Sequence, residues 1–444
     1  MMRALFSAVS GIKTHQTRMD VIGNNIANVN TVAYKSQAVT FKDVYYQTTQ
    51  TATGPNADSG KGGVNPKQIG LGSSVGAIST AMTQGSNERT DNPWDLCISG
   101  NAFFVVSSGG NTYFTRSGDF KPDLSGALVT QGGANVMGWK ADENGNIVKD
   151  KVQPLYVMSP EYMFTAPAKT TDVTITGNVD ARTTESSVFT VNFFDSLGNE
   201  YQASLTLKYE GINGQNVEYS ISEGTVTKNG EKTNIILDTA ASPRLLFDKT
   251  TGASAMSNAN LDLSFIYDGD STGDLENIGT GGAQSSTISL DASGLTMYAS
   301  ATDIKYSKGR TDELTGNVVG AGKAVGTMTA VGINEAGGVV ASYSNGDTKI
   351  IGQIAVTTFA NPTGLEKVGE NLYAATLNSG SFDGIGKDIS ETGGKIVSGY
   401  LEMSNVDLAD QFTTMITTQR GYQANSRIIT VSDSLLEELI NLKR

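Results

Sequence analysis

Apolar residues recur every seven positions at both ends of this chain, and this spacing constrains the fold more than any other feature. The N-terminal series consists of Leu5, Ile12, Met19 and Ile26, with Ile22 three places after Met19. Heptad spacing predicts an α-helix that buries a narrow apolar seam against another helix. Gly11 and Gly23 each lower the helix preference by about 1 kcal/mol relative to Ala, so this segment needs a partner to form a stable helix.

The C-terminal series has the same spacing and a recognisable start signal. Its apolar positions are Leu408, Met415, Tyr422, Ile429 and Leu436. Ser404 and Asp407 have the S-x-x-D spacing of a capping box, and Met403 can pack on Leu408 as a hydrophobic staple. These features predict a helix from about residue 405 to residue 442. Polar residues interrupt its second apolar row, and such a helix gains its stability from neighbours.

We interpret the two terminal segments as an assembly interface, a coiled coil that closes when subunits pack together. The apolar residues of the two series would form this interface. The first helical segment ends in four asparagines, Asn24, Asn25, Asn28 and Asn30. Asparagine favours caps and turns over helix interiors, and we expect these amides to bond with glutamines of the second helix across chains. The alternative is an ordinary pair of terminal helices packed on one globular domain.

Between the helical ends the chain is expected to be mainly β-structure. The segment EYQASLTLKY (200–209) alternates apolar and polar residues, which is typical of a strand with one buried face. It follows another strand-like segment across a glycine-containing hairpin loop at 195–199. Residues 51–75 are rich in Gly, Pro and Ser, and they are predicted to form a loop or an extended arm.

The length of 444 residues exceeds what one ordinary core holds, so we expect several domains. The expected domains are 1–45 with 400–444 as a terminal helical assembly domain, 46–75 as a connecting arm, 76–154 with 291–399 as a split β-rich domain, and 155–290 as an inserted outer β-domain. The inserted segment is acidic, with 17 acidic and 7 basic side chains. We expect it to be a solvated body.

Charge and hydropathy argue against two classes of partner. The formal net charge is −13 at pH 7, and there is no basic patch or stripe of the kind that binds nucleic acid. No apolar run approaches the roughly 20 residues that a membrane-spanning helix needs. The N-terminus lacks the apolar stretch of a secretory signal, so the protein is expected to stay in the cytoplasm or to be exported without cleavage.

Catalytic and metal-binding patterns are weak throughout the sequence. His15 is the only histidine, which argues against a histidine-based triad or a multi-histidine metal site, and we interpret it as a helix-interface residue. Cys97, the single cysteine, stands in an apolar run and is interpreted as a core residue. Segments 316–324 and 268–276 resemble a phosphate loop and a calcium loop, but each lacks a required residue. Neither an enzyme activity nor a cofactor is expected.

Four segments resemble conserved regions of the bacterial flagellar rod and hook subunit family. GNNIANVNTVAYKS (23–36) resembles its N-terminal signature, and the segment 399–429, which begins GYLEMSNVDLADQ, resembles its C-terminal helix signature. Residues 92–139 and 350–376 resemble the two halves of its β-domain. The signature residues implied by this resemblance are Asn25, Asn28, Asn30, Tyr34, Lys35, Ser404, Asn405, Asp407, Gln419, Arg420 and Tyr422.

Ala33 departs from the family pattern, because Gly usually precedes the aromatic residue of this signature. If this position has a positive φ, Ala is strained there. Asn30 is the alternative residue at which the chain can turn.

The resemblance implies a structural subunit of the hook type, since rod subunits lack an insert as large as 155–290. Such a subunit passes through the flagellar type III export apparatus without a cleaved signal and lies in the extracellular flagellum. It self-assembles into a curved helical tube that transmits torque from rod to filament as a flexible joint. The implied partners are copies of itself, the rod and hook–filament junction proteins, and the hook cap. The alternatives are a distal rod subunit and, from another class, a secreted β-rich adhesin.

Overall fold

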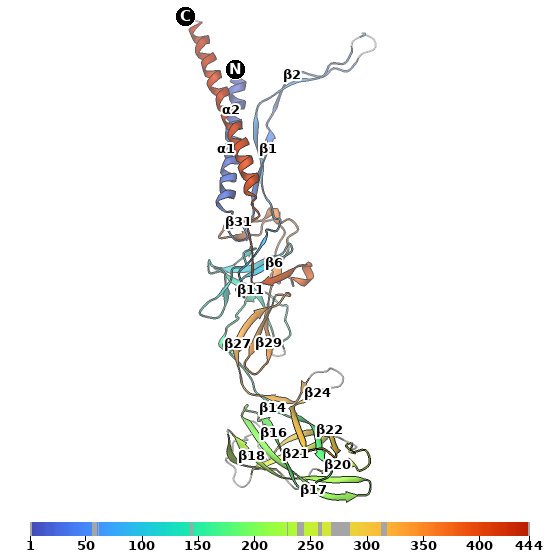
Figure 1. Cartoon of the computed structure of the whole chain (residues 1–444). Coiled ribbons are helices and arrows are strands. Elements are labelled where there is room, and N and C mark those ends of the chain that lie inside the picture. Colours follow the sequence, from blue (N-terminus) through green and yellow to red (C-terminus); the bar gives the residue numbers. More distant parts are fainter. Residues whose placement is uncertain are drawn as a thin grey trace. The chain divides into compact units, whose positions relative to one another are not determined.

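The chain folds mainly as β-structure with one long α-helix near each end, as the sequence predicted (Figure 1). The computed structural model describes residues 2–55, 60, 62–142, 145–228, 230–237, 244–255, 260–267, 285–311 and 318–442. The calcium-like segment 268–276 and the start of the Gly-rich segment 316–324 lie outside these residues. The chain divides into two compact units, of which unit 1 is Met1–Ser159, Val331–Ala341 and Lys349–Arg444, and unit 2 is Pro160–Ala330 and Ser342–Thr348.

Unit 1 contains both helices, α1 (Met2–Ala27) and α2 (Leu408–Asn441). α2 begins about three residues later than predicted, because Asp407 rather than Ser404 is its N-cap. The Asp407 carboxylate accepts hydrogen bonds from two backbone N–H groups of the first turn. Ser404 lies before the helix, where its hydroxyl accepts a hydrogen bond from the Val406 N–H. Either residue type can cap a helix, so contacts of the chain before the helix decide between them.

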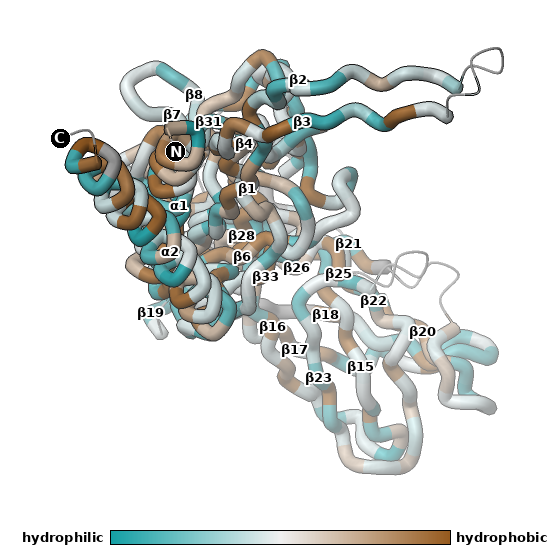
Figure 2. The backbone as a smooth tube through the Cα atoms, turned by 90° about the horizontal axis from the view of Figure 1, so that it is seen from above, coloured by the Kyte–Doolittle hydropathy of each residue, from teal (hydrophilic) through white to brown (hydrophobic). Residues whose placement is uncertain are grey.

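A β-ribbon follows α1 in the sequence. β1 (Gln37–Asp43) pairs antiparallel with β4 (Ser73–Thr80), and β2 (Tyr46–Gln50) pairs antiparallel with β3 (Lys67–Gly70). The segment 51–75 is therefore partly a ribbon strand rather than a loop throughout. Every residue of β2 and β3 is exposed, and Figure 2 shows the two strands side by side. A two-stranded ribbon of this kind is only marginally stable without further packing.

The body of unit 1 is an antiparallel sheet over an aromatic core. Its strands are β7 (Phe103–Ser108), β8 (Asn111–Thr115), β9 (Lys121–Pro122), β10 (Leu128–Val129), β11 (Asn135–Lys140), β12 (Gln153–Pro154), β29 (Thr348–Ile354), β30 (Val356–Thr357), β31 (Glu366–Gly369) and β32 (Leu372–Ala374). Four successive residues of β7 are buried, as in a strand covered on both faces. Its aromatic members are Phe103, Phe114, Trp139 and Tyr373.

Two short strand pairs connect the sheet region to the start of α2. β6 (Leu96–Ser99) pairs with β33 (Lys395–Ser398), and β5 (Asn87–Arg89) pairs with β34 (Tyr400–Glu402). These pairs hold the C-terminal signature against residues far away in the sequence. They therefore fix the position of Glu402 before the chain turns into α2.

Unit 2 is a separate β-structure with its own core. Its main strands are β15 (Asp172–Asp180), β16 (Ser187–Phe194), β17 (Glu200–Asn213), β18 (Asn216–Lys228), β19 (Glu231–Leu237), β20 (Arg244–Asp248), β21 (Asn260–Tyr267), β22 (Ser285–Tyr298) and β23 (Asp303–Lys308). Along the described strands the order is β16-β17-β18-β19-β21-β22-β15-β23, with β20 beside β18. In β17, Tyr201, Ala203 and Leu205 are buried and alternate with less buried residues, which confirms the predicted alternation.

Short strands complete the fold. They are β13 (Phe164–Thr165), β14 (Ala168–Thr170), β24 (Arg310–Thr311), β25 (Val318–Val319), β26 (Ala321–Lys323), β27 (Gly326–Ile333) and β28 (Gly338–Tyr343). Residue 290, where the sequence analysis ended the inserted domain, lies inside β22. β22 continues to Tyr298 in parallel pairing with β15, and β23 extends the same sheet. Strand pairing thus keeps residues beyond 290 in unit 2, and the four-part domain division remains a prediction.

Candidate functional site: a buried junction of the two chain ends

The segment after α1 and the segment before α2 meet in a cluster of polar side chains. We call this cluster the junction and define it as Asn25, Tyr34, Lys35, Glu402 and Asn405. All of them except the half-buried Asn405 are buried. Buried polar groups are costly unless their hydrogen bonds are satisfied, so the partners of each side chain show how the junction is held together.

Asn25 connects the end of α1 to two other elements. Its side-chain N–H₂ donates to the backbone oxygen of Gln37 at 2.8 Å and to Oε1 of Gln411 at 3.0 Å. Its Oδ1 accepts from the Gln37 N–H at 3.0 Å and from the Tyr34 hydroxyl at 3.3 Å. One amide therefore joins α1, the start of β1 and the first turn of α2. This bond to Gln411 lies within one chain, whereas the sequence analysis expected such amides to bond across chains.

Asn405 performs the corresponding role from the C-terminal side. Its Oδ1 accepts from the Ser36 N–H at 2.7 Å, and its N–H₂ donates to the Ala81 backbone oxygen at 2.8 Å and to Thr83 Oγ1 at 3.0 Å. The backbone N–H of Asn405 donates to the Tyr34 backbone oxygen at 3.3 Å. The chain is thereby held outside the helix until Asp407, which explains the late start of α2.

Lys35, Glu402 and Arg116 form a charged triad next to these amides. Lys35 Nζ is 2.5 Å from Glu402 Oε1, and both side chains are fully buried. Arg116 approaches Glu402 Oε2 at 3.5 Å, and the Gly85 N–H donates to Oε1 at 3.0 Å. Lys35 also donates to the Thr83 backbone oxygen at 2.7 Å. A single carboxylate thus serves two cations and one backbone amide.

Burial is the main cause of the pKa shifts of the two cations. Desolvation lowers the pKa of Lys35 and of Arg116, although the nearby Glu402 carboxylate opposes the decrease for both cations. Burial also raises the pKa of the neighbouring Cys97 thiol to about 11, so the thiol stays protonated and unreactive at neutral pH. The cluster is therefore a structural ion network that depends on Glu402.

Ala33 occupies the strained conformation that its departure from the family pattern suggested. Its φ is 56°, in the left-handed region, and its side chain is buried. Its N–H donates to the Glu402 backbone oxygen at 2.7 Å. The turn is therefore made at Ala33 itself; Asn30 has no positive φ and is exposed.

The other signature residues have separate roles. Asn28 closes the end of α1, since its side-chain N–H₂ donates to the Asn24 backbone oxygen at 2.9 Å. Arg420 donates to Gln423 on the surface of α2 at 3.3 Å, Gln419 is exposed, and Tyr422 is half-buried. Neither the junction residue Glu402 nor its partner Arg116 was predicted from the sequence. The available signal was a lone acidic residue within the short apolar segment GYLEM.

The two helices pack antiparallel through small and polar residues. Besides the bond between Asn25 and Gln411, a Cβ added to Gly11 would lie 2.7 Å from Nδ2 of Asn425, and one added to Gly421 would lie 2.6 Å from the His15 ring. His15 is thus at the helix interface, as interpreted from the sequence. Its ring also meets Phe41 of β1 edge-on at 5.5 Å between centroids, and burial together with Arg18 lowers its pKa.

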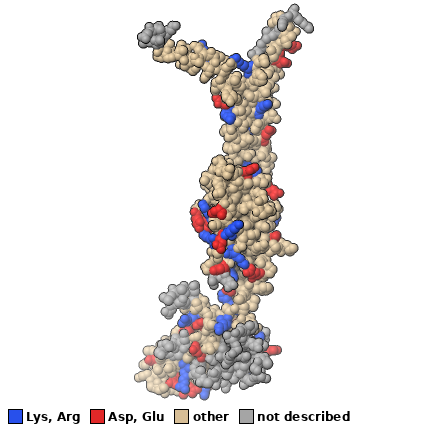
Figure 3. Space-filling model, turned by 180° about the vertical axis from the view of Figure 1, so that it is seen from behind, with Lys and Arg blue, Asp and Glu red and all other residues tan. Residues whose placement is uncertain are grey.

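The apolar residues of the two heptad series lie partly within this pair. Ile22 is buried and Leu408 is exposed; the half-buried members are Leu5, Ile12, Met19, Ile26, Met415, Tyr422, Ile429 and Leu436. Other large apolar side chains of the helices are exposed, namely Met2, Phe6, Phe412, Ile416, Ile428, Val431, Leu435 and Ile440. Figure 3 shows that the visible face of the helical region is mostly uncharged. The coiled-coil seam remains a prediction.

The described residues show no constellation for metal or membrane chemistry. No group of three or more His, Cys, Asp or Glu side chains within them is arranged to hold a metal ion. Among the same residues, no helix is long and apolar enough to cross a membrane. What the junction can do chemically is to hold two distant segments in one rigid arrangement.

Three family matches cover the junction residues and Arg116. Residues 5–35 match the family described as flagella basal body rod protein, residues 97–181 the flagellar hook protein FlgE/F/G D1 domain, and residues 397–442 the flagellar basal body rod FlgEFG protein C-terminal region. The flagellar hook protein FlgE of Borreliella burgdorferi is 36% identical and that of Treponema pallidum 35% identical, each with 100% of both chains covered. The flagellar basal-body rod protein FlgG of Bacillus subtilis is 29% identical, again over 100% of both chains.

Proposed function

The chain belongs to the flagellar FlgE/F/G family and is a hook subunit, and we propose that it assembles into a curved helical tube that transmits torque from rod to filament. The family builds structural parts of the flagellum outside the cell and polymerises within it. The proposal concerns how this chain supplies the contacts of that polymer.

One observation carries the proposal: the helix pair buries several small and polar residues and leaves many apolar residues exposed or only half-buried. Leu408, Phe412 and Ile416 are spaced four residues apart and form one exposed stripe on α2. Ile428, Val431 and Leu435 form a second stripe at spacings of three and four. Contiguous exposed apolar surface marks interaction sites in soluble proteins. These stripes, together with the half-buried heptad residues, are the proposed assembly interface.

The junction would then set the position of this interface. Because Asn25, Lys35, Glu402 and Asn405 tie both chain ends to the sheet region of unit 1, a force on the helix pair is passed to that region through buried bonds. Dense packing and satisfied buried polar groups resist deformation. We infer that the junction transmits torsion within one subunit.

Further partners follow from the family. We propose that the tube contacts rod and hook–filament junction proteins at its ends, that a hook cap covers it during growth, and that the type III export apparatus delivers the subunits. The alternative expected from the sequence, a distal rod subunit, has weaker support, because the FlgG relative is 29% identical over the whole chain and the two hook proteins are 36% and 35% identical. Straight rather than curved assemblies of the purified protein would favour this second role.

Substitutions in the first stripe test the interface. We expect Phe412→Glu/Ile416→Glu to abolish tube formation in electron micrographs under polymerising conditions and to leave the circular dichroism of the monomer unchanged. Val188→Glu is the matched control, because Val188 is equally exposed but lies in unit 2. Normal tubes from the double variant would reject the interface. Deletion of residues 405–444 is a weaker test, since it also removes Asn405 from the junction.

A further inference from the structure

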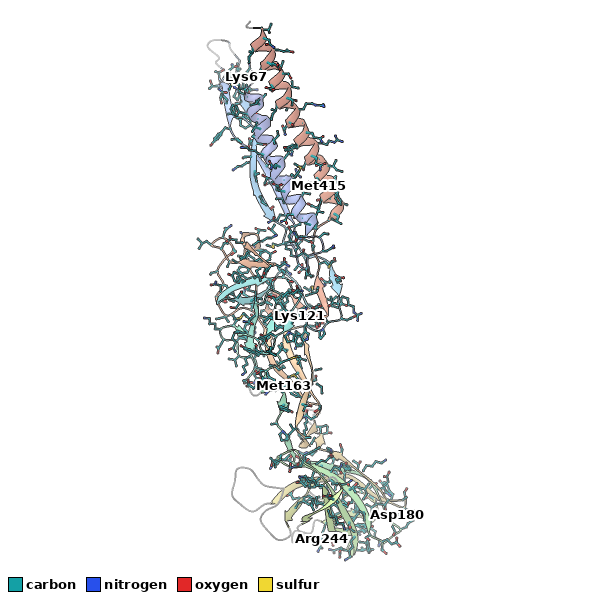
Figure 4. All side chains as sticks on the ribbon, turned by 90° about the vertical axis from the view of Figure 1, so that its left-hand side faces the viewer. Lys67, Lys121, Met163, Asp180, Arg244 and Met415 are labelled. Atoms are coloured by element: carbon teal, nitrogen blue, oxygen red, sulfur yellow. The ribbon has the colours of Figure 1, made fainter. Side chains whose placement is uncertain are left out.

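Two leucines of unit 1 are exposed to a degree that the fold does not require. Leu124 and Leu377 are 106% and 108% exposed, as open as in an extended peptide. Leu124 is at the tip of the β9–β10 turn, just after Lys121, which is labelled in Figure 4. Leu377 is in the loop after β32. A single exposed leucine is common on protein surfaces, so what surrounds each leucine decides whether it marks a contact.

The turn that carries Leu124 is rigid. Asp123 Oδ1 accepts from the Ser125 hydroxyl at 2.7 Å and from the Ala127 N–H at 2.8 Å, and the Gly126 N–H donates to the Asp123 backbone oxygen at 3.0 Å. Tyr156 and Met158 are also exposed, and their segment lies beside this turn. Ala127 and Tyr156 form an isolated antiparallel β-bridge, and the Met158 N–H donates to the Gly126 backbone oxygen. Leu124, Tyr156 and Met158 are thus exposed apolar side chains on two neighbouring segments, which together we call the knob.

A groove on the same unit has matching properties. It is a broad, open groove of about 1420 Å³, and Leu377 is one of its lining residues. Phe114, Met137, Val152 and Phe382 contribute apolar surface to it. Its charged members are Lys151, Glu366 and Asp383. The turn that carries Leu124 also has Lys121 and Asp123. Lys121 can pair with an acidic residue of the groove, and Asp123 can pair with Lys151.

We propose that the knob of one subunit inserts into this groove of a second copy, with Leu124 beside Leu377, a contact that rests on the assembly proposed above. Knob and groove are different surfaces of the same unit, so the contact is heterologous. A heterologous contact that does not close on itself produces an open helical assembly, as a tube requires. Lys151 would face Asp123 of the neighbour, and Asp383 would face Lys121.

Cysteine cross-linking between copies tests this contact. One population carries Leu124→Cys and the other Leu377→Cys; after polymerisation of an equal mixture and mild oxidation, we expect disulfide-linked dimers to approach the statistical limit of about half of the subunits. The native Cys97 is buried and does not compete. Mixtures of Leu124→Cys with Leu197→Cys, an exposed position of unit 2, are the control and should yield at least tenfold less dimer.

The outcomes separate this contact from the proposed function. Tubes that form normally without cross-links overturn the knob-and-groove contact and leave hook assembly intact. Absence of tubes from the wild-type protein under all polymerising conditions counts against assembly itself. As a second measurement, Leu124→Glu should raise the critical concentration for assembly at least tenfold with an unchanged monomer; an unchanged critical concentration refutes the contact.

Discussion

Neutralising Glu402 should damage unit 1 more than removing Lys35, because Glu402 is the acceptor that two cations share. Glu402→Gln keeps the size of the side chain but removes its charge. Lys35 and Arg116 then face each other in a desolvated site, and Glu402 is their only ion-pair partner within the described part of the chain. Lys35→Met, in contrast, leaves Glu402 paired with Arg116 and with the Gly85 N–H.

The magnitudes follow from this geometry. Breaking a buried pair so that a charge is left uncompensated costs about 3–5 kcal/mol, and we expect this loss for Glu402→Gln. Lys35→Met removes the 2.7 Å hydrogen bond from Lys35 to the Thr83 backbone oxygen, which still accepts from Asn405 at 3.2 Å; loss of one hydrogen bond to a charged group costs about 1.5–3 kcal/mol. The difference of about 2 kcal/mol is large beside a total stability of roughly 5–15 kcal/mol.

Tryptophan fluorescence in urea measures this difference for unit 1 alone. The chain has two tryptophans, Trp94 and Trp139, and both belong to unit 1. Glu391→Gln is the matched control, since the Lys149–Glu391 pair of unit 1 is exposed and should be worth at most about 1 kcal/mol. Equal losses for Glu402→Gln and Lys35→Met, or a larger loss for Lys35→Met, would refute the shared-acceptor account.

Three further predictions concern single residues of unit 1. Folding lowers the pKa of His15 below its ordinary value of 6.5, so the unfolded state binds the proton first as the pH falls. The free energy of unfolding should therefore decrease as the pH drops below 6.5. Thermal melts followed at 222 nm should show this pH dependence in the wild type and not in His15→Gln. Burial raises the pKa of the Cys97 thiol to about 11, so Ellman's reagent at pH 8 should not modify the native protein but should react fully with the protein unfolded in urea. Prompt reaction of the native protein would contradict the burial of Cys97. Ala33→Val places a β-branched residue at φ 56° and should lower the free energy of unfolding by more than about 2 kcal/mol. Ala33→Gly should leave it nearly unchanged, because relief of backbone strain offsets the lost methyl burial and the added entropy of the unfolded chain. Urea unfolding midpoints measure both changes, and an unchanged midpoint for Ala33→Val would contradict the strain.

Local patterns explain the parts of the fold that could be predicted. Heptad spacing identified both helices, and alternation identified β17, because each signal depends on neighbours within one turn or one strand. The start of α2 was misplaced for the complementary reason. Ser404 and Asp407 are both good caps locally, and only the bonds of Asn405 to residues 36 and 81–83 selected Asp407.

The sequence by itself determined where helices and strands form and which segments carry the family signature. Tertiary structure alone decided that Lys35 meets Glu402, 367 positions further along the chain, and that Arg116 shares the same carboxylate. It also decided that the helices face each other through Gly11, Gly421 and polar side chains, so that apolar stripes remain exposed. The physical reason is that side-chain periodicity is set by backbone geometry over a few residues, whereas burial of a charge is permitted only by partners that folding brings from elsewhere.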